Sequence, residues 1–264
     1  MLLDKAKNAV KSVPFLHHTL RPIVRHIRRR GGEDERLQLY CVRLPDFVAE
    51  PVFVKVGAND GISGDPVSDV LLAHGKWKGL LIEPVPVIFE RLRKNFSDSQ
   101  RYILEQVAIG AQSGKAAFYY VDGKAIESIP DLPFWYDQLG SFNREHIVKH
   151  LDGALTPFIL ECSVEVHPLS EVLKKNGIRD VHLLHIDAEG YDYEVLKTID
   201  LSSAPPAAIL LEHKNLSDGD KAELVQHLRR HGYSVDDCGG DLFAVHKKSP
   251  LSKLARDWAF RARG

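Results

Sequence analysis

Between residues 52 and 211 the sequence alternates short apolar segments with longer amphipathic ones, and this alternation restricts the fold more than any other feature. Such alternation predicts a parallel sheet covered by helices on both faces. The expected strands of this sheet are 52–56, 79–82, 102–107, 181–186 and 207–211. A further pair, 233–235 and 242–245, encloses a Gly-Gly step and predicts a C-terminal antiparallel hairpin. We therefore expect an α/β fold with a mostly parallel, Rossmann-like sheet.

The remaining segments predict helices and an insertion. Helices are expected at 66–73, 87–96, 169–176, 192–198 and 217–231, the last one capped by Ser217. Two more strands, 116–121 and 163–166, flank an insertion at about 122–160 that is rich in aromatic residues, Pro and Gly. We expect this insertion to be irregular and to carry the substrate site, as loops on rigid scaffolds often do.

Three parts of the chain are distinguished by composition. They are a basic amphipathic extension over 1–45, a domain over 46–246 and a basic tail over 247–264. The extension is interpreted either as a solvated helix packed on the domain or as an interfacial helix on anionic lipid. The basic tail supports the second interpretation without deciding between the two, so peripheral membrane contact through the basic termini is one of two open expectations.

Charge and cysteine content exclude several classes of protein. The formal net charge of -1 gives no overall attraction for nucleic acid. Three widely separated cysteines without a C-x-x-C pair indicate neither a disulfide framework nor a cysteine zinc site, which fits a reducing, cytoplasmic compartment. Lys and Arg interrupt the N-terminal segment, so we expect neither a signal peptide nor a membrane span there.

The most informative motif is FVKVGANDG over 53–61, where an apolar strand runs into a glycine turn. Glycine lets the backbone approach a nucleoside ligand closely, so Gly57 and Gly61 are candidate cofactor-binding residues, with Asn59 and Asp60 as polar partners. Glu83 ends the second strand about 20 residues later, where a carboxylate binds ribose hydroxyls. A surface acid in an ordinary turn is the plainer interpretation of Glu83.

A nicotinamide-dependent oxidoreductase would use the same two features. The turn departs from G-x-G-x-x-G, which is the pattern that binds a pyrophosphate at a helix N-terminus. Tyr193 and Lys197 form a Y-x-x-x-K pair, which we interpret as helix-surface or packing residues. A dinucleotide is therefore the less favoured ligand.

The sequence resembles the FkbM family of methyltransferases over roughly residues 52–246. The matching blocks are VGANDGISGDP, LLIEPVPVIFERLRKNF, VAIG, HPLSEVL and LLHIDAEGYDYEVLK, in the expected order. The resemblance implies a class I methyltransferase fold, S-adenosylmethionine as cofactor, and transfer of methyl to an oxygen of a sugar or polyketide-type metabolite. It assigns Gly57 and Gly61 to the cofactor loop and Glu83 to the ribose.

Further assignments follow from the same resemblance. Val107 and Ala108 fall near the adenine, Glu105 and Gln106 within reach of its amino group, and Asp187 at the end of the fourth parallel strand, facing the methionine moiety and the acceptor. The insertion and the termini match poorly, which leaves the acceptor open. A small molecule, sugar or glycan is expected, and a catalytically silent binding module of the same fold is the alternative.

Deprotonation of an acceptor hydroxyl at neutral pH calls for a base or a metal. Asp187, Glu189, Glu212 and His213 follow buried strands and are expected at the carboxyl edge of the sheet. Either Asp187 and Glu212 hold Mg²⁺, or Asp187 or His213 is the base. Capping of the strand by Glu212 and His213, or pairing with Lys214, is the structural alternative.

The insertion supplies the candidate substrate residues. His146 and His150 are four apart and share a helical face, which suits substrate or metal binding, although no acidic ligand follows them at a telling spacing. Trp135 and Tyr136 present aromatic faces that stack on a sugar ring or pack inside the insertion. Glu189 is the additional substrate candidate.

Overall fold

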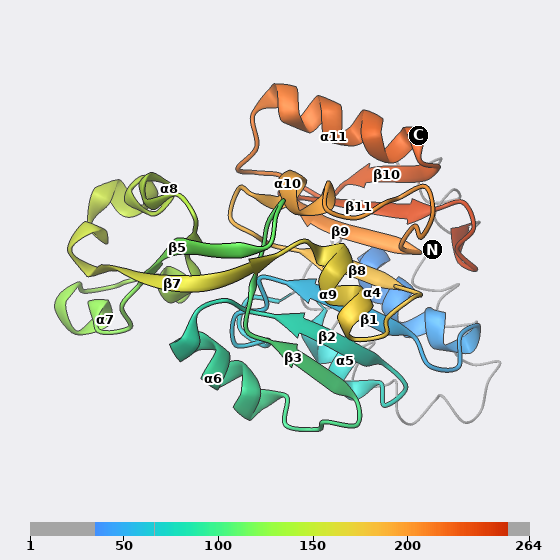
Figure 1. The fold of residues 1–264 in the computed structure, drawn as a ribbon, viewed down its shortest axis with the longest axis horizontal. Coiled ribbons are helices and arrows are strands. Elements are labelled where there is room, and N and C mark those ends of the chain that lie inside the picture. The colour runs from blue at the N-terminus through green and yellow to red at the C-terminus, as the bar shows by residue number, and fades with distance from the viewer. Residues whose placement is uncertain (1–34, 66, 253–264) are drawn as a thin grey trace.

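The computed structural model describes residues 35–65 and 67–252 and contains a central seven-stranded sheet (Figure 1). Its strands follow the order β10-β11-β9-β8-β1-β2-β3. They are β1 (Val52–Val56), β2 (Lys78–Ile82), β3 (Tyr102–Glu105), β8 (Leu183–Ile186), β9 (Ala208–Glu212), β10 (Tyr233–Asp237) and β11 (Asp241–His246). Strands β3, β2, β1, β8 and β9 are parallel, whereas β11 is antiparallel to β9 and β10. The expected α/β fold, with a mostly parallel Rossmann-like sheet and a C-terminal antiparallel hairpin, is confirmed.

Helices cover both faces of this sheet because the strand residues alternate between two hydrophobic cores. Phe53 and Leu183 belong to the core shared with α4, α5 and α6, and Val54 and Leu184 to the core shared with α9, α10 and α11. The helices are α4 (Glu35–Arg43), α5 (Ser68–Ala73), α6 (Pro86–Asn95), α9 (Leu169–Lys175), α10 (Asp192–Leu196) and α11 (Asp218–Arg230). The predicted cap of α11 is present, since the Ser217 side chain accepts a hydrogen bond from the Asp220 amide.

The end of the predicted N-terminal extension is part of the domain. Helix α4 and the 3₁₀ turn η1 (Leu44–Asp46) contribute buried residues to the first core, and the Tyr40 hydroxyl donates to the His182 carbonyl at 2.9 Å. Residues 1–34, Pro66 at the expected start of α5, and residues 253–264 of the basic tail lie outside the described residues. In 35–65 and 67–252, every helix falls short of the length and apolar character that crossing a membrane requires.

A second, four-stranded sheet projects from the central one (Figure 1). Strand β5 (Gly114–Val121) pairs antiparallel with β7 (Ile159–His167), and the short strands β4 (Ala108–Ile109) and β6 (Gly140–Ser141) flank them. The predicted strand 102–107 is shorter than expected, because the chain leaves β3 at Glu105 and joins the second sheet at Ala108.

The insertion at the tip of β5 and β7 is ordered, in contrast to the irregular segment that we expected. It contains α7 (Ala125–Ser128), α8 (Arg144–Val148) and the 3₁₀ turns η2 (Tyr136–Gln138), η3 (His150–Gly153) and η4 (Thr156–Phe158). The reason is a small core of its own, formed by Val121, Ala125, Tyr136, Leu139, Ile147 and Leu155. This core stabilises the insertion independently of the two cores of the central sheet.

Candidate functional site

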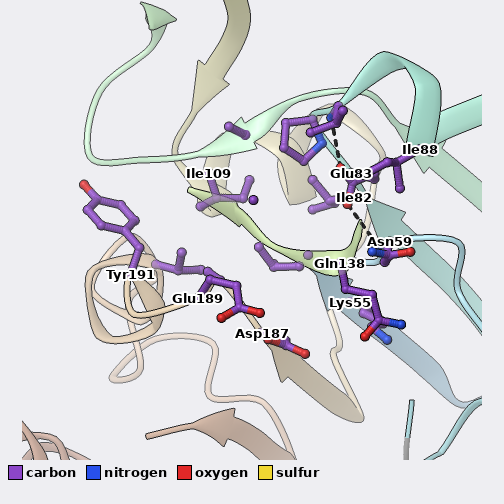
Figure 2. A pocket seen from close by; sticks show the side chains of 18 of the residues that line it. Lys55, Asn59, Ile82, Glu83, Ile88, Ile109, Gln138, Asp187, Glu189 and Tyr191 are labelled. Carbon is purple, nitrogen blue, oxygen red and sulfur yellow. Dashed lines mark hydrogen bonds between the residues drawn. The ribbon is translucent and has the colours of Figure 1, made fainter. Parts of the chain in front are cut away.

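A cleft of about 890 Å³, open to solvent, lies at the carboxyl ends of β1, β2 and β8 (Figure 2). From β1 the strand order proceeds outward to β2 and β3 on one side and to β8 and β9 on the other. The cleft therefore occupies the topological switch point, where open α/β sheets bind their ligands.

The glycine turn forms one wall of the cleft directly after β1. The amides of Gly57 and Ala58 donate to the Ile82 carbonyl at 3.1 and 2.9 Å, so the turn stays against the end of β2. Gly57 has φ +72°, and a Cβ atom there would lie 1.8 Å from the Asp187 carbonyl oxygen. Only glycine therefore lets the ends of β1 and β8 meet. Gly57 and Asn59 line the cleft.

Glu83 follows β2 and is buried, with 6% of its surface exposed. One carboxylate oxygen accepts the Asn59 amide at 3.0 Å and the other accepts the Val85 amide at 2.9 Å (Figure 2). Burial raises the pKa of Glu83 to about 7. Each oxygen keeps a further lone pair, so the carboxylate that borders the cleft can still accept hydrogen bonds from a ligand.

Asp60 and Gly61 shape the turn without lining the cleft. The Asp60 carboxylate accepts the amides of Ile62 and Ser63 at 2.9 and 2.8 Å. A Cβ atom on Gly61 would lie 2.3 Å from the Phe96 ring, so this glycine is required by packing against α6. Their predicted cofactor contacts stay predictions.

Apolar side chains form the neighbouring wall. Val107 and Ala108, at the crossing between the two sheets, line the cleft together with Ile82 and Ile88. Gln106 is exposed and lies outside the lining, and Glu105 binds Lys175 and Asn176 at 2.8 and 2.7 Å. The surface on which an adenine would lie is thus apolar.

Acidic side chains gather at the opposite end of the cleft from Glu83 (Figure 2). Asp187 and Glu189, which follow β8, line this end. Burial, followed by the negative charges of Glu212 and Glu189, raises the pKa of Asp187 well above its usual range. Asp192 accepts the amides of Ala188 and Gly190 at 2.9 and 3.0 Å, which fixes the loop that carries these acids.

Glu212 and His213 end β9 as expected, but neither lines the cleft. Glu212 forms an ion pair with Lys214 and accepts the Asn215 amide group at 2.9 Å. Burial and Glu189 raise its pKa. The buried His213 ring lies with Nε2 3.4 Å from Asp237, on the side of the C-terminal hairpin. Pairing with Lys214, one of the structural alternatives, is therefore present for Glu212, whereas strand capping and the base and Mg²⁺ roles stay predictions.

The insertion reaches the cleft with residues that the sequence did not single out. Gln138, Gly140 and Phe142 line it, and the Gln138 side chain donates to the Ser63 carbonyl at 3.0 Å. An ion pair between Arg91 and Asp137, at 2.6 Å, fastens the insertion to α6. The insertion thus contacts both α6 and the loop that follows the glycine turn.

The predicted insertion residues lie beside the cleft, outside its lining. Tyr136 belongs to the insertion core and its hydroxyl donates to the Gly123 carbonyl at 2.8 Å, whereas Trp135 is half-buried with its ring 5.9 Å from that of His150. His146 Nε2 lies 3.3 Å from the Glu189 carboxylate. His146 therefore contacts an acid that does line the cleft.

Lys55, Asp65 and His185 form a buried charged cluster that was not predicted from the sequence. The Lys55 ammonium contacts the Asp65 carboxylate, and His185 Nδ1 lies 3.8 Å from the same carboxylate. Burial opposes ionisation of Asp65, but Lys55 and His185 outweigh it and hold the pKa of Asp65 at about 2. Burial lowers the pKa of His185 to about 4. Lys55 and Asp65 line the cleft, and the available signal was a lysine inside the apolar run 52–56.

The chain is similar in sequence to methyltransferases of one family. The family model described as the methyltransferase FkbM domain matches residues 55–235. The 31-O-demethyl-FK506 methyltransferase FkbM of Streptomyces tacrolimicus is 28% identical over 197 residues, covering 70% of this chain and 73% of that protein.

Two solved structures show weaker likeness. The precorrin-6y C5,15-methyltransferase of Geobacter metallireducens GS-15 has a TM-score of 0.37 and 14% identity, covering 80% of this chain and 84% of that one. The fibrillarin pre-rRNA processing protein of Methanococcus jannaschii has a TM-score of 0.39 and 13% identity, covering 74% and 65%. At these TM-scores neither likeness bears on function.

Proposed function

Because the chain belongs to the FkbM family of S-adenosylmethionine-dependent methyltransferases, we propose that it methylates a hydroxyl oxygen of a sugar, glycan or glycosylated metabolite. One observation carries this proposal: a single cleft joins the glycine turn and Glu83 at one end to Asp187 and Glu189 at the other. A nucleoside cofactor and a hydroxylated acceptor would thus meet within one cleft.

The cofactor end fits the adenosine part of S-adenosylmethionine. Glu83 offers a carboxylate to the two ribose hydroxyls, and the turn at Gly57 and Asn59 brings backbone close to the ligand. Val107 and Ile88 provide apolar contact for the adenine ring. Bound there, S-adenosylmethionine would supply an electrophilic methyl carbon.

The acceptor end combines acids with aromatic rings. Tyr191 lies beside Glu189 at this end (Figure 2), and the Phe142 ring packs against Tyr191 with ring centroids 5.3 Å apart. Aromatic faces pack against the apolar face of a sugar ring, while carboxylates accept hydrogen bonds from its hydroxyls. The curated relative carries O-methyl transfer in its name, which supports oxygen as the atom methylated.

Asp187 is the best-placed proton acceptor. It lies inside the cleft at the end of β8, whereas Glu212 and His213 lie behind the lining. A carboxylate here would take the hydroxyl proton while the walls of the cleft hold the acceptor oxygen in line with the methyl carbon, and alignment of this kind supplies much of a displacement rate. The negative charge of Glu212 then contributes by raising the pKa of Asp187.

Calorimetric titration with S-adenosylhomocysteine and, separately, with NAD tests the proposal without knowledge of the acceptor. Saturable binding of S-adenosylhomocysteine alone is the expected result. Binding of NAD alone would identify an oxidoreductase, and binding of neither ligand would identify a catalytically silent module. If Mg²⁺ at Asp187 and Glu212 is required, a chelator abolishes turnover and Mg²⁺ restores it.

A further inference from the structure

Two histidines of the insertion and one acid of the central domain converge beside the cleft. His146 lies on α8, His150 begins η3, and Glu189 belongs to the loop after β8. One potential ligand atom from each lies within 4.8 Å of the other two. The acidic partner that the sequence around His146 and His150 lacks is thus provided by a distant segment.

The rings are oriented as in metal-binding histidines. His150 Nδ1 lies 2.9 Å from the His146 carbonyl oxygen, a hydrogen bond in which Nδ1 is the donor. That tautomer leaves the lone pair of His150 on Nε2, and a second hydrogen bond of this type is what fixes ligating imidazoles in metalloproteins. His146 directs Nε2 at the Glu189 carboxylate, at 3.3 Å.

Glu189 is itself held in place. Its backbone has φ +48°, a left-handed conformation that is rare for residues other than glycine and that concentrates at functional sites. The Asn215 side chain also lies 3.4 Å from the same carboxylate oxygen that faces His146. The acid therefore has little freedom to turn away from the two rings.

We propose that His146, His150 and Glu189 bind one divalent cation of the Zn²⁺ class. Two imidazoles and a carboxylate form a donor set that suits Zn²⁺ and similar transition ions, whereas Mg²⁺ prefers oxygen ligands alone. Three protein ligands leave a fourth position for water or an acceptor oxygen. The site differs in residues and in metal class from the Mg²⁺ pair predicted at Asp187 and Glu212.

The chain contains a built-in comparison for this site. His227 and His231 on and after α11 are also four apart, and His231 Nδ1 lies 2.8 Å from the His227 carbonyl. Within the described residues, that pair has no acidic residue that completes a group of three ligands at the same distance. A variant of this second pair therefore shows whether two histidines with the same spacing and ring orientation suffice to bind the cation, or whether the acid is needed as well.

The role of the cation rests on the proposed function. Glu189 lines the acceptor end of the cleft, so a cation bound to it stands where an acceptor hydroxyl is expected and would lower the cost of deprotonating that hydroxyl. The same ion would fasten the insertion to the loop after β8, since its ligands come from both.

Titration of the chelator-treated, desalted full chain with ZnCl₂ tests the site in the absence of any substrate. We expect one Zn²⁺ per chain, and we expect His150→Gln and Glu189→Gln to weaken binding by at least about tenfold, the lower limit seen when even an outer partner of a ligand is lost. His231→Gln should bind Zn²⁺ as the unaltered chain does. Circular dichroism of each variant verifies that it is folded.

Failure of the unaltered chain to bind Zn²⁺ saturably, or equal weakening in His231→Gln, overturns the inference. If a variant does not fold, the visible absorption of Co²⁺ bound to the unaltered chain decides: an intense four-coordinate spectrum supports the site, and the spectrum of aqueous Co²⁺ overturns it. Titration of the same preparation with S-adenosylhomocysteine distinguishes failure of the metal site from failure of the proposed methyltransferase function. Zn²⁺ can bind when S-adenosylhomocysteine does not, and S-adenosylhomocysteine can bind when Zn²⁺ does not.

Discussion

The Glu83 carboxylate accepts the backbone amide of Asn59 at 3.0 Å, so the acid after β2 and the turn after β1 form one hydrogen-bonded unit. The carboxylate orients the turn, and the turn keeps the carboxylate at the edge of the cleft. A change to either residue therefore acts on both walls of the cofactor end.

Glu83→Gln should weaken S-adenosylhomocysteine binding by about 1.5–3 kcal/mol, the range for hydrogen bonds to a charged group. Isothermal titration calorimetry measures the change. Glu105→Gln is the matched control, because Glu105 ends the next strand but binds Lys175 and Asn176 outside the cleft lining. Equal affinity of Glu83→Gln and the unaltered chain would remove Glu83 from the cofactor site.

The stability of the ligand-free protein should fall between pH 4.5 and 7 because of Glu83. Burial raises its folded pKa from 4.5 to about 7, so its contribution is fully present below pH 4.5 and is lost as the pH rises through about 7. Thermal unfolding at pH 5 and pH 8 should show a larger advantage of the unaltered chain over Glu83→Gln at pH 5. A gap that does not depend on pH contradicts this assignment.

Gly57→Ala should destabilise the fold by more than the about 1–2 kcal/mol that a left-handed backbone costs an L-residue. The added Cβ would lie 1.8 Å from the Asp187 carbonyl and would force β1 and β8 apart. Urea denaturation measures the loss. Gly75→Ala serves as the control, since a Cβ there meets no atom within 4 Å. Similar stabilities of the two variants would show that the turn tolerates a side chain.

Asp65→Asn should destabilise the protein by about 3–5 kcal/mol, because it leaves the buried Lys55 ammonium without its counter-charge. Glu90→Gln, which breaks the exposed pair with Arg93, should cost at most about 1 kcal/mol. Urea denaturation of both variants makes the comparison. Equal losses of unfolding free energy in the two variants would show that the buried ion pair stabilises the protein no more than the exposed one.

Asp187→Asn should lower kcat by about 10²–10⁴-fold, the contribution of a general base, with a much smaller change in S-adenosylhomocysteine affinity. Its melting temperature should rise above that of the unaltered chain at a pH above the raised pKa of Asp187, where the ionised Asp187 lies near the negative charges of Glu212, Glu189 and Asp192. Methyl transfer to an acceptor found by screening glycans gives kcat. Retained turnover would assign proton abstraction to another group.

The sheet and the cofactor loop could be predicted because their signals are local. The apolar runs of β1 and β8 and the glycine turn between β1 and α5 are each visible within a few residues. Strand ends also placed Asp187 and Glu189 correctly at one edge. The side-chain directions of Glu212 and His213 were not predictable, since they depend on Lys214 and on the hairpin that carries Asp237.

The parts that sequence reasoning missed are contacts between distant segments. Lys55 and His185 lie on neighbouring strands and meet Asp65 from a loop, and no spacing links the three. Gln138 and Phe142 reach the cleft only because β5 and β7 aim the insertion toward it. The approach of His146 to Glu189 has the same origin.

The paired strands β5 and β7 also bear on how such a protein diversifies. The insertion enters and leaves through adjoining residues, Val121 opposite Ile159, so its two ends are already joined by the ladder. A replacement segment of different length or sequence could join the domain at that one pair, and its small separate core spares the main domain from repacking, while its contacts with α6 and with Ser63 would be replaced as well. If the proposed function holds, acceptor preference would change by exchange of this module during evolution while the half of the protein that carries the glycine turn and Glu83 is inherited intact.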